Sequence, residues 1–416
     1  MITISLCMIV KNEEAVLERL LKTMSNVADQ IVIVDTGSTD RTKEIAARYT
    51  DEVYDFPWTD DFAAARNAAC QKAVMDYWMW MDADDVMEPE QAVRLMKLKE
   101  NLDPSVDVVM MKYLTDFDEN GRTSFSYYRE RLLRNHKGFQ WQGRVHEAVT
   151  PAGSILYTDI EIQHRKEAAG DKDRNLRIYE TMLNQGELLE PRHQFYYARE
   201  LYYHERYEDA VRAFRAFLQE PEGWVENKID ACLHLALCEE HLGHTEKAME
   251  ALLKSFLYDT PRGEVCCELG RMKMMDEKYK EAAYWYTQAL SSQPAEQTGA
   301  FVRKDCYGFL PAIQLCVCYD RLGDYRRAWH YHLKSQKLKP EHPSVRQNQT
   351  YFERILKHPA EVNPAAVFPA AGRDPEDHRD QPDQQALRGQ WDPGDSPVRQ
   401  GHGGLRDLWD FQDLRA

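Results

Sequence analysis

Several classes of protein are excluded by what the sequence lacks. Its 416 residues contain no apolar stretch that approaches the length of a membrane-spanning helix. The apolar residues 2–10 form a short run with no basic segment before it, and the polar residues 11–14 follow at once. We therefore interpret residues 2–10 as a strand rather than a signal peptide, and we expect no membrane span.

Positive charge is also in short supply. Lysine and arginine together number 53, against 69 aspartates and glutamates, so the formal net charge is −16. A chain with this balance repels the phosphate backbone of nucleic acids and the surface of anionic membranes. We expect neither nucleic acid nor a membrane surface as a main partner.

Paired cysteines are missing as well. The nine cysteines are an odd number, and none of them shows the C-x-x-C spacing of zinc sites and redox motifs. Most fall on apolar faces of predicted helices, where a free cysteine acts as a small core residue. The sequence thus predicts neither disulfides nor a zinc site, and it favours a reducing, cytoplasmic location.

Alternating strand and helix patterns fill the first part of the chain. Strands are predicted at residues 2–10, 30–35, 52–56 and 77–81, with helices between them. Such alternation is typical of a mainly parallel sheet, so we predict a Rossmann-like α/β domain over residues 1–170.

Charged residues stand at the ends of three of these strands. The acidic segment 82–85 directly follows residues 77–81, Lys11 follows the first strand, and Asp35 ends the second. In open parallel sheets, ligands bind beyond the carboxyl ends of the strands. Two or three carboxylates at such a place can hold Mg²⁺ or Mn²⁺, which usually keep substrate phosphates among their ligands. The alternative is an acidic turn in which Asp85 or a neighbour caps the next helix.

Paired helices follow, and they carry a repeat. From about residue 193 a small residue is expected in the second helix of each pair, and it recurs at Ala210, Ala248, Ala282 and Ala328. The intervals are 38, 34 and 46 residues, and the middle one equals the period of a tetratricopeptide repeat. Gly243 and Gly323 mark turns between paired helices, and the longest interval predicts an insertion within residues 297–309. We expect the all-α region at residues 171–358 to stack into a superhelix with a concave binding surface.

The composition changes again in the last part of the chain. Residues 359–416 are rich in proline, glycine, aspartate, arginine and glutamine and contain few core-forming residues. We predict that this tail is disordered.

Four motifs in the first hundred residues together carry a family resemblance. They are residues 11–13 after the first strand, Asp35 in IVIVDTGSTD, Arg66 in AAARNAA, and MDADD after the fourth strand. In this order they resemble the nucleotide-sugar half of a GT-A glycosyltransferase of family two. With the later run WQGRVHE and the helical repeats, the chain is similar to bacterial glycosyltransferases that include the sublancin-type peptide S-glycosyltransferases.

The resemblance implies a set of donor-binding residues, and a UDP-sugar as the donor, with UDP-glucose as the first choice on family grounds. These residues are Val10, Lys11, Glu13, Asp35, Arg66, Asp82 and Ala83. The first strand end and Asp35 would hold the uridine, Arg66 would help to fix the base, and Asp82 would lie near the ribose.

Metal binding is implied by the same resemblance. Asp84 and Asp82 would bind Mg²⁺ or Mn²⁺, and His164 at the end of a late strand would complete the metal shell. Simpler roles exist for several of these residues. Asp35 could cap the next helix, and Arg66 could be an exposed helix residue.

The acceptor needs a base to take its proton as the new bond forms. Glu147 is the first candidate, because it follows an aromatic, glycine-containing segment suited to a sugar pocket. His146 is the alternative base, or it has a structural role. Trp141 is expected either to stack on a sugar face or to be a core aromatic residue.

These elements lead to one principal hypothesis and two alternatives. The principal one is a metal-dependent, inverting glycosyltransferase whose repeats dock a peptide or protein acceptor and could also form a homodimer. The first alternative acts on a cell-envelope or small-molecule acceptor. The second is a non-catalytic scaffold protein that senses a nucleotide, against which the intact acidic and arginine motifs speak.

Overall fold

The computed structural model describes two compact units. The described residues are 1–117, 121, 123–165, 171–295 and 298–357. The first unit comprises residues 1–268 and 292–307, and the second comprises residues 269–291 and the described residues from 308 onward. The predicted disordered tail, residues 359–416, lies outside the described residues.

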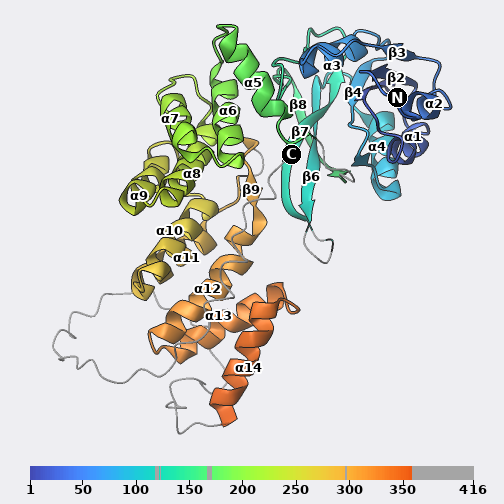
Figure 1. Cartoon of the computed structure of the whole chain (residues 1–416). Coiled ribbons are helices and arrows are strands. Elements are labelled where there is room, and N and C mark those ends of the chain that lie inside the picture. Colours follow the sequence, from blue (N-terminus) through green and yellow to red (C-terminus); the bar gives the residue numbers. More distant parts are fainter. Residues whose placement is uncertain (118–120, 122, 166–170, 296–297, 358–416) are drawn as a thin grey trace. The chain divides into compact units, whose positions relative to one another are not determined.

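A single sheet forms the centre of the first unit. Its strands are β1 (Ile4–Val10), β2 (Gln30–Asp35), β3 (Val53–Asp55), β4 (Tyr77–Trp80), β5 (Asp85–Val86), β6 (Val108–Phe117), β7 (Thr123–Arg134), β8 (Ile155–His164) and β9 (Val302–Arg303). They are ordered β3-β2-β1-β4-β7-β6-β8-β5, and β9 pairs with β7 (Figure 1). The four strands β3, β2, β1 and β4 are parallel, as predicted. The sheet as a whole is mixed, because β7 runs antiparallel to both β4 and β6.

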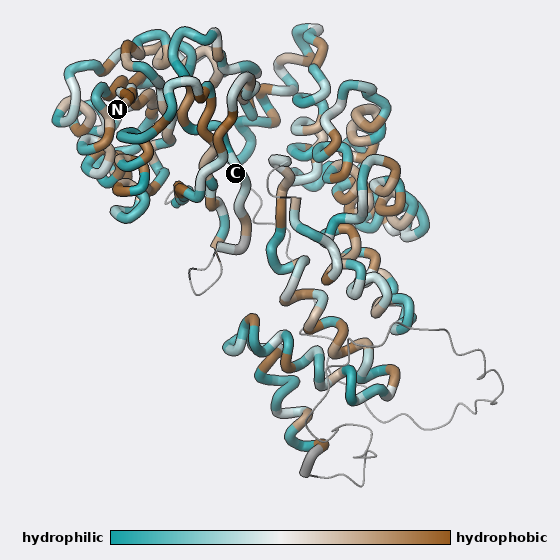
Figure 2. Tube along the Cα trace, turned by 180° about the vertical axis from the view of Figure 1, so that it is seen from behind, coloured by the Kyte–Doolittle hydropathy of each residue, from teal (hydrophilic) through white to brown (hydrophobic). Residues whose placement is uncertain are grey.

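Helices cover both faces of this sheet. The helices α1 (Leu17–Met24), α2 (Thr42–Ala46) and α4 (Pro89–Asn101) contribute side chains to one core cluster, and α3 (Phe62–Cys70) contributes to another. The central strands are strongly hydrophobic along their length (Figure 2). The apolar face of α1 is buried, with Leu17, Leu20, Leu21 and Met24 each at most 1% exposed.

Helical pairs make up the rest of the described chain. They are α5 (Arg174–Asn184), α6 (Pro191–Tyr203), α7 (Tyr207–Phe217), α8 (Val225–His241), α9 (Thr245–Lys254), η1 (Ser255–Leu257), α10 (Gly263–Met275), α11 (Tyr279–Ser291), η3 (Lys304–Tyr307), α12 (Phe309–Arg321), α13 (Tyr325–Leu338) and α14 (Pro343–Lys357). The four repeat alanines lie on α7, α9, α11 and α13, and each is at most 1% exposed. Gly243 and Gly323 have φ angles of 79° and 73°, as helix-ending glycines require.

The predicted insertion within residues 297–309 contains β9 and η3. Strand β9 pairs with the first part of β7, where Val302 is opposite Ser126 and Arg303 is opposite Phe125. The backbone N–H of Arg303 also donates to Glu264 at the start of α10, at 2.6 Å. The insertion therefore links the sheet to the helices within the first unit.

Two predictions from composition can be compared with this structure. All nine cysteines are free thiols, and eight of them are buried, as the core role requires. Within the described ranges, none of the helices combines the length and the apolar character needed to cross a membrane.

Candidate active site

The ends of β1 and β2 meet at one edge of the sheet. Val10 is the register partner of Asp35, and the carbonyl of Val10 accepts a hydrogen bond from the N–H of Thr36 at 2.9 Å. The loops beyond are tied together, because the N–H of Asn12 donates to the hydroxyl of Ser38 at 2.9 Å. Lys11 is exposed at this edge.

Asp35 has one oxygen engaged and one without a partner. Oδ1 accepts from the N–H groups of Gly37 and Ser38 at 3.0 and 2.9 Å. Oδ2 is buried and has no hydrogen-bond partner among the described residues. An unmade hydrogen bond of this kind costs about 1–3 kcal/mol, so Oδ2 suits a ligand N–H or O–H. Asp35 does not cap α2, whose N-cap residue is Arg41.

Arg66 of α3 bridges two carboxylates. Its Nε donates to Glu147 Oε1 at 2.6 Å, and its Nη2 donates to Asp82 Oδ1 at 2.7 Å. The guanidinium lies 5.1 and 4.8 Å from the ring centres of Trp80 and Trp141. Arg66 is only 8% exposed, so the alternative of an exposed helix residue is wrong.

The charges of this trio stabilise one another. Burial opposes the charge of Arg66, but Asp82 and Glu147 outweigh it and hold the pKa of Arg66 above its ordinary value. Burial would likewise raise the pKa of Asp82, but Arg66 and then Arg131 lower it to about 2. Asp82 is therefore ionised at neutral pH, and it can accept hydrogen bonds from a ribose.

The acidic turn 82–85 is closed by its own backbone and by a late strand. The N–H of Asp85 donates to the carbonyl of Asp82 at 3.0 Å, and Ala83 between them is buried. Asp85 is the register partner of His164, because β5 pairs with β8. The backbone N–H of Arg165 donates to the carbonyl of Asp84 at 3.0 Å.

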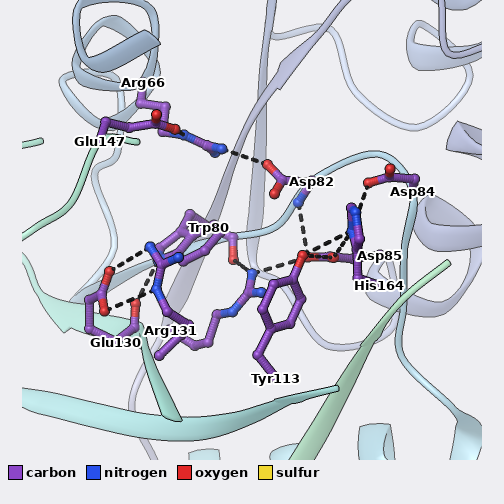
Figure 3. A network of polar contacts seen from close by, with 11 residues as sticks. Arg66, Trp80, Asp82, Asp84, Asp85, Tyr113, Glu130, Arg131, Glu147 and His164 are labelled. Atoms are coloured by element: carbon purple, nitrogen blue, oxygen red, sulfur yellow. Dashed lines mark hydrogen bonds and ion pairs between the residues drawn. The ribbon is translucent and has the colours of Figure 1, made fainter. Parts of the chain in front are cut away.

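His164 lies among three oxygen atoms. Its Nδ1 is 3.3 Å from Asp84 Oδ1, 3.5 Å from Asp85 Oδ1 and 3.0 Å from the hydroxyl of Tyr113. Burial would lower the pKa of His164, but Asp84 and Asp85 raise it to about 10. Figure 3 shows Asp82 between Arg66 on one side and this group of side chains on the other.

The buried side chain of Asp85 stabilises the turn through hydrogen bonds. It is 0% exposed, and its Oδ1 accepts from Tyr113 while its Oδ2 accepts from Arg131 Nη1 at 3.0 Å and from the N–H of Asp82. The expectation that Asp85 caps the next helix is wrong. That helix, α4, begins at Pro89 with Glu88 as its N-cap residue, and Asp85 is committed to a buried ion pair instead.

Three side chains at this turn could hold a metal ion. Asp84, Asp85 and His164 offer ligand atoms that all lie within 4.8 Å of one another. Because both oxygens of Asp85 already accept hydrogen bonds, Asp84 and His164 are the better ligands. The Asp84 side chain is 21% exposed, so a diphosphate could complete the shell. The structure turns Asp82 toward Arg66 and does not place it in this group.

Glu13 faces the same acidic edge. Its backbone N–H donates to the hydroxyl of Thr42 at 2.7 Å, which fixes the loop after β1 against α2. Burial, and after it the carboxylates of Asp84 and Asp82, raise the pKa of Glu13 to about 7. Glu13, which was predicted at the first strand end, thus lies close enough to the predicted metal turn to be affected by its carboxylates.

The segment 141–147 separates the three candidates that it carries. Trp141 is 3% exposed and is held by two hydrogen bonds to Asn67, at 2.9 and 3.0 Å, so it is a core aromatic residue. His146 points to α6, where its Nε2 is 2.9 Å from Glu200 Oε1. Glu147 is the only one of the three that forms an ion pair with Arg66, which in turn contacts Asp82.

Some residues of the site were missed by reasoning from the sequence. Arg131 of β7 is fully buried, and its guanidinium lies 3.7 and 4.2 Å from the ring centres of Trp80 and Tyr113 (Figure 3). The available signal was a charged residue directly before Leu132 and Leu133 in a strand. The contribution of α6 gave no signal, because it depends on how a distant helix packs.

Comparison with known proteins gives a family match for part of the chain. Residues 5–159 match the family model described as Glycosyl transferase family 2. This part of the chain is a family 2 glycosyltransferase domain. The matched range contains every predicted site residue except His164, which follows it by five residues.

Curated relatives match parts of the chain. A TPR repeat-containing protein of Synechococcus elongatus is 34% identical over 149 residues, which are 36% of this chain and 36% of the relative. The SPbeta prophage-derived glycosyltransferase SunS of Bacillus subtilis is 25% identical over 229 residues, 50% of this chain and 51% of the relative. The chain thus spans about a third to a half of the lengths of these two relatives.

Solved structures also match. A glucosyl-3-phosphoglycerate synthase from Mycobacterium tuberculosis, in complex with Mn²⁺ and UDP-glucose, is 15% identical with a TM-score of 0.32. The match covers 45% of this chain and 80% of that one.

Proposed function

We propose that this protein is a metal-dependent, inverting glycosyltransferase that moves a sugar from a UDP-sugar to an acceptor. The observation that carries the proposal is the meeting of three features at one edge of the sheet. These are the unpartnered Oδ2 of Asp35, the ionised Asp82 held by Arg66, and the pair of Asp84 and His164. Together they suit a nucleoside, a ribose and a metal-bound diphosphate, in that order.

Each group has a distinct task in the proposed donor site. Asp35 accepts a hydrogen bond from the uridine, and Arg66 keeps Asp82 ionised and oriented for the ribose. A cation held by Asp84 and His164 would stabilise the charge that develops on the leaving diphosphate. Because an imidazole ligand suits Mn²⁺ better than the harder Mg²⁺, we propose Mn²⁺ as the preferred ion and UDP-glucose as the donor to test first.

Glu147 is the proposed base on the acceptor side. Arg66 holds its Oε1, so the proton of the acceptor would go to Oε2. Glu147→Gln keeps an amide oxygen for Arg66 but removes the basic group. We expect this variant to bind UDP as wild type does and to lose most of its transfer to a hydroxyl. If Glu147→Gln lost UDP binding to the same extent as it lost transfer, Glu147 would have a positioning role instead.

The experiment that tests the activity is UDP release from a panel of UDP-sugars with Mn²⁺ and no added acceptor. Wild type should release UDP slowly from one of them, and Asp84→Ala should not. Asp159→Ala is a matched control, because Asp159 is an exposed aspartate on β8 and should not affect release. Equal release by wild type and Asp84→Ala would refute the metal assignment, and no release by either would refute the activity.

A peptide or protein is the acceptor class that we propose. It is supported by the helical repeats, because stacked repeats of this kind form extended binding surfaces. A second class is favoured by one relative, the lipopolysaccharide core biosynthesis glycosyltransferase LpsC of Rhizobium meliloti, which is 28% identical over 152 residues. If the enzyme transferred sugar to a cell-envelope glycan and not to peptides, the acceptor would belong to this second class.

Two further parts of the proposal concern the setting of the enzyme. The nine free thiols suit a reducing compartment, so we propose a cytoplasmic location. We also propose that the helical pairs can support a homodimer. Light scattering of the purified full chain tests this point, and a monomer at all concentrations would exclude the homodimer.

A further inference from the structure

The loop between β7 and β8 is held at its base by the family 2 domain. An isolated antiparallel bridge joins Gln142 to Ala148, with hydrogen bonds of 2.9 and 3.1 Å. The carbonyl of Arg144 accepts from the N–H of Phe62 at the start of α3, at 2.8 Å. The bridge closes residues 143–147 into a short loop, and Glu147 is the last residue of this loop before Ala148.

The tip of this loop is held by α6, which lies outside the family 2 match. The ring of His146 stacks on Tyr196, with centroids 4.2 Å apart and an interplanar angle of 11°. Arg192 donates to the carbonyl of His146 at 3.3 Å. Gly143, with a φ angle of 97°, lies so close to His193 that a Cβ would overlap the imidazole.

Glu200 is the central partner of the tip on α6. Glu200 is 6% exposed. Its Oε1 accepts a hydrogen bond from Asn175 Nδ2 at 3.0 Å and lies 2.9 Å from His146 Nε2. His146 itself has a φ angle of 50°, a backbone conformation that a residue other than glycine keeps only when its surroundings enforce it. The contacts with α6 are what enforces it.

Two neighbouring residues of the loop therefore contact different helices. His146 is bound to α6, and Glu147 is bound to Arg66 of α3. We propose that His146, Glu200 and Tyr196 are positioning residues, which fix the backbone at residue 146 and so aim Glu147 at the acceptor. This inference rests on the proposed function, in which Glu147 is the base. It makes α6 part of the catalytic unit, although α6 belongs to the helical region.

The variant that tests this is Glu200→Ala in the full chain, with Glu200→Gln as the conservative rescue. The glutamine keeps an oxygen that accepts from His146. Glu239→Ala is the matched control, because Glu239 on α8 is a buried carboxylate that pairs with His244 at 2.8 Å, in a different helical pair. It should cost similar stability without touching the loop.

Kinetics give the first readout, as UDP release from UDP-glucose with Mn²⁺. Glu200→Ala should lower kcat by about tenfold to a hundredfold, the range for a misplaced catalytic group, and should leave KM within about twofold. Glu200→Gln should retain most of kcat, and Glu239→Ala should match wild type. Equal kcat values for Glu200→Ala and Glu239→Ala would overturn the inference while leaving the proposed function intact.

Hydrogen exchange gives a second readout that needs no activity. The amides of residues 141–148 should exchange faster in Glu200→Ala than in wild type, and Glu239→Ala should not change them. Tyr196→Leu should act in the same direction, which keeps the test open if Glu200→Ala fails to fold. Unchanged exchange in both variants would overturn the inference. Absence of UDP release from wild type would refute the proposed function, and the exchange result would still decide the positioning.

Discussion

Replacing Arg131 by methionine should destabilise the first unit by about 3–5 kcal/mol, because the change leaves a buried carboxylate without its cation. The side chains of Arg131 and Asp85 are both 0% exposed, and Nη1 lies 3.0 Å from Oδ2. Methionine replaces much of the apolar volume between Trp80 and Tyr113, so the loss of the charge dominates the effect.

The expected size of the effect follows from general thermodynamics. For a unit of about this size, each kcal/mol lowers the melting temperature by roughly 2–4 °C, so the drop should be at least about 6 °C. Thermal unfolding followed by circular dichroism and by calorimetry measures it. Arg177→Met is the control, because Arg177 and its partner Asp171 are an exposed pair on the surface, and it should melt close to wild type.

A double variant separates the charge effect from a packing effect. Asp85→Asn combined with Arg131→Met removes both charges, so it should be less destabilised than the sum of the two single variants. A melting temperature of Arg131→Met within about 2 °C of wild type would refute the reasoning, because it corresponds to less than about 1 kcal/mol. Strict additivity in the double variant would also refute it.

Three further predictions concern folding and its pH dependence. Gly143→Ala should destabilise the protein by at least about 1–2 kcal/mol in urea unfolding, because its positive φ disfavours any side chain and a Cβ would overlap His193; an unchanged midpoint would contradict this. Asn67→Ala should cost about 1–3 kcal/mol, because the backbone groups of buried Trp141 lose both partners, and a cost below about 0.5 kcal/mol would exclude that role. Burial raises the pKa of Glu264 above 4.5, so the folded state holds this proton more tightly than the unfolded chain, and stability should fall as pH rises from 4.5 through the raised pKa. Glu264→Gln should flatten that slope, and an equally steep slope in the variant would refute the assignment.

Local patterns in the sequence were sufficient to predict the first half of the sheet. The strands β1, β2 and β4 are short, buried runs next to turn signals, and β3 follows the same alternation of strand and helix, so local patterns were enough to predict them. The ends of such strands share one edge, which is why Lys11, Asp35 and the segment 82–85 were predicted together. The repeat alanines could be aligned because the helical pairs recur along the chain, although only one of the three intervals equals the repeat period of 34 residues.

The remaining features depend on contacts between residues far apart in the sequence. Asp85 was predicted to cap a helix, but pairing between β5 and β8 and the approach of Arg131 from β7 bury it instead. Strand β9 is only two residues long, so no periodicity could reveal it. The choice between His146 and Glu147 was left open, because the packing of α6 against the loop separates their roles.

The most direct test of the nucleotide and metal site is the binding of UDP to the full chain, measured by calorimetry with Mn²⁺ and again with EDTA. We expect binding of one UDP per chain in Mn²⁺, and loss of that binding in EDTA and in Asp84→Ala. UDP binding that is equally tight in EDTA, or equally tight in Asp84→Ala, would contradict this expectation, and so would the absence of UDP binding to wild type in Mn²⁺.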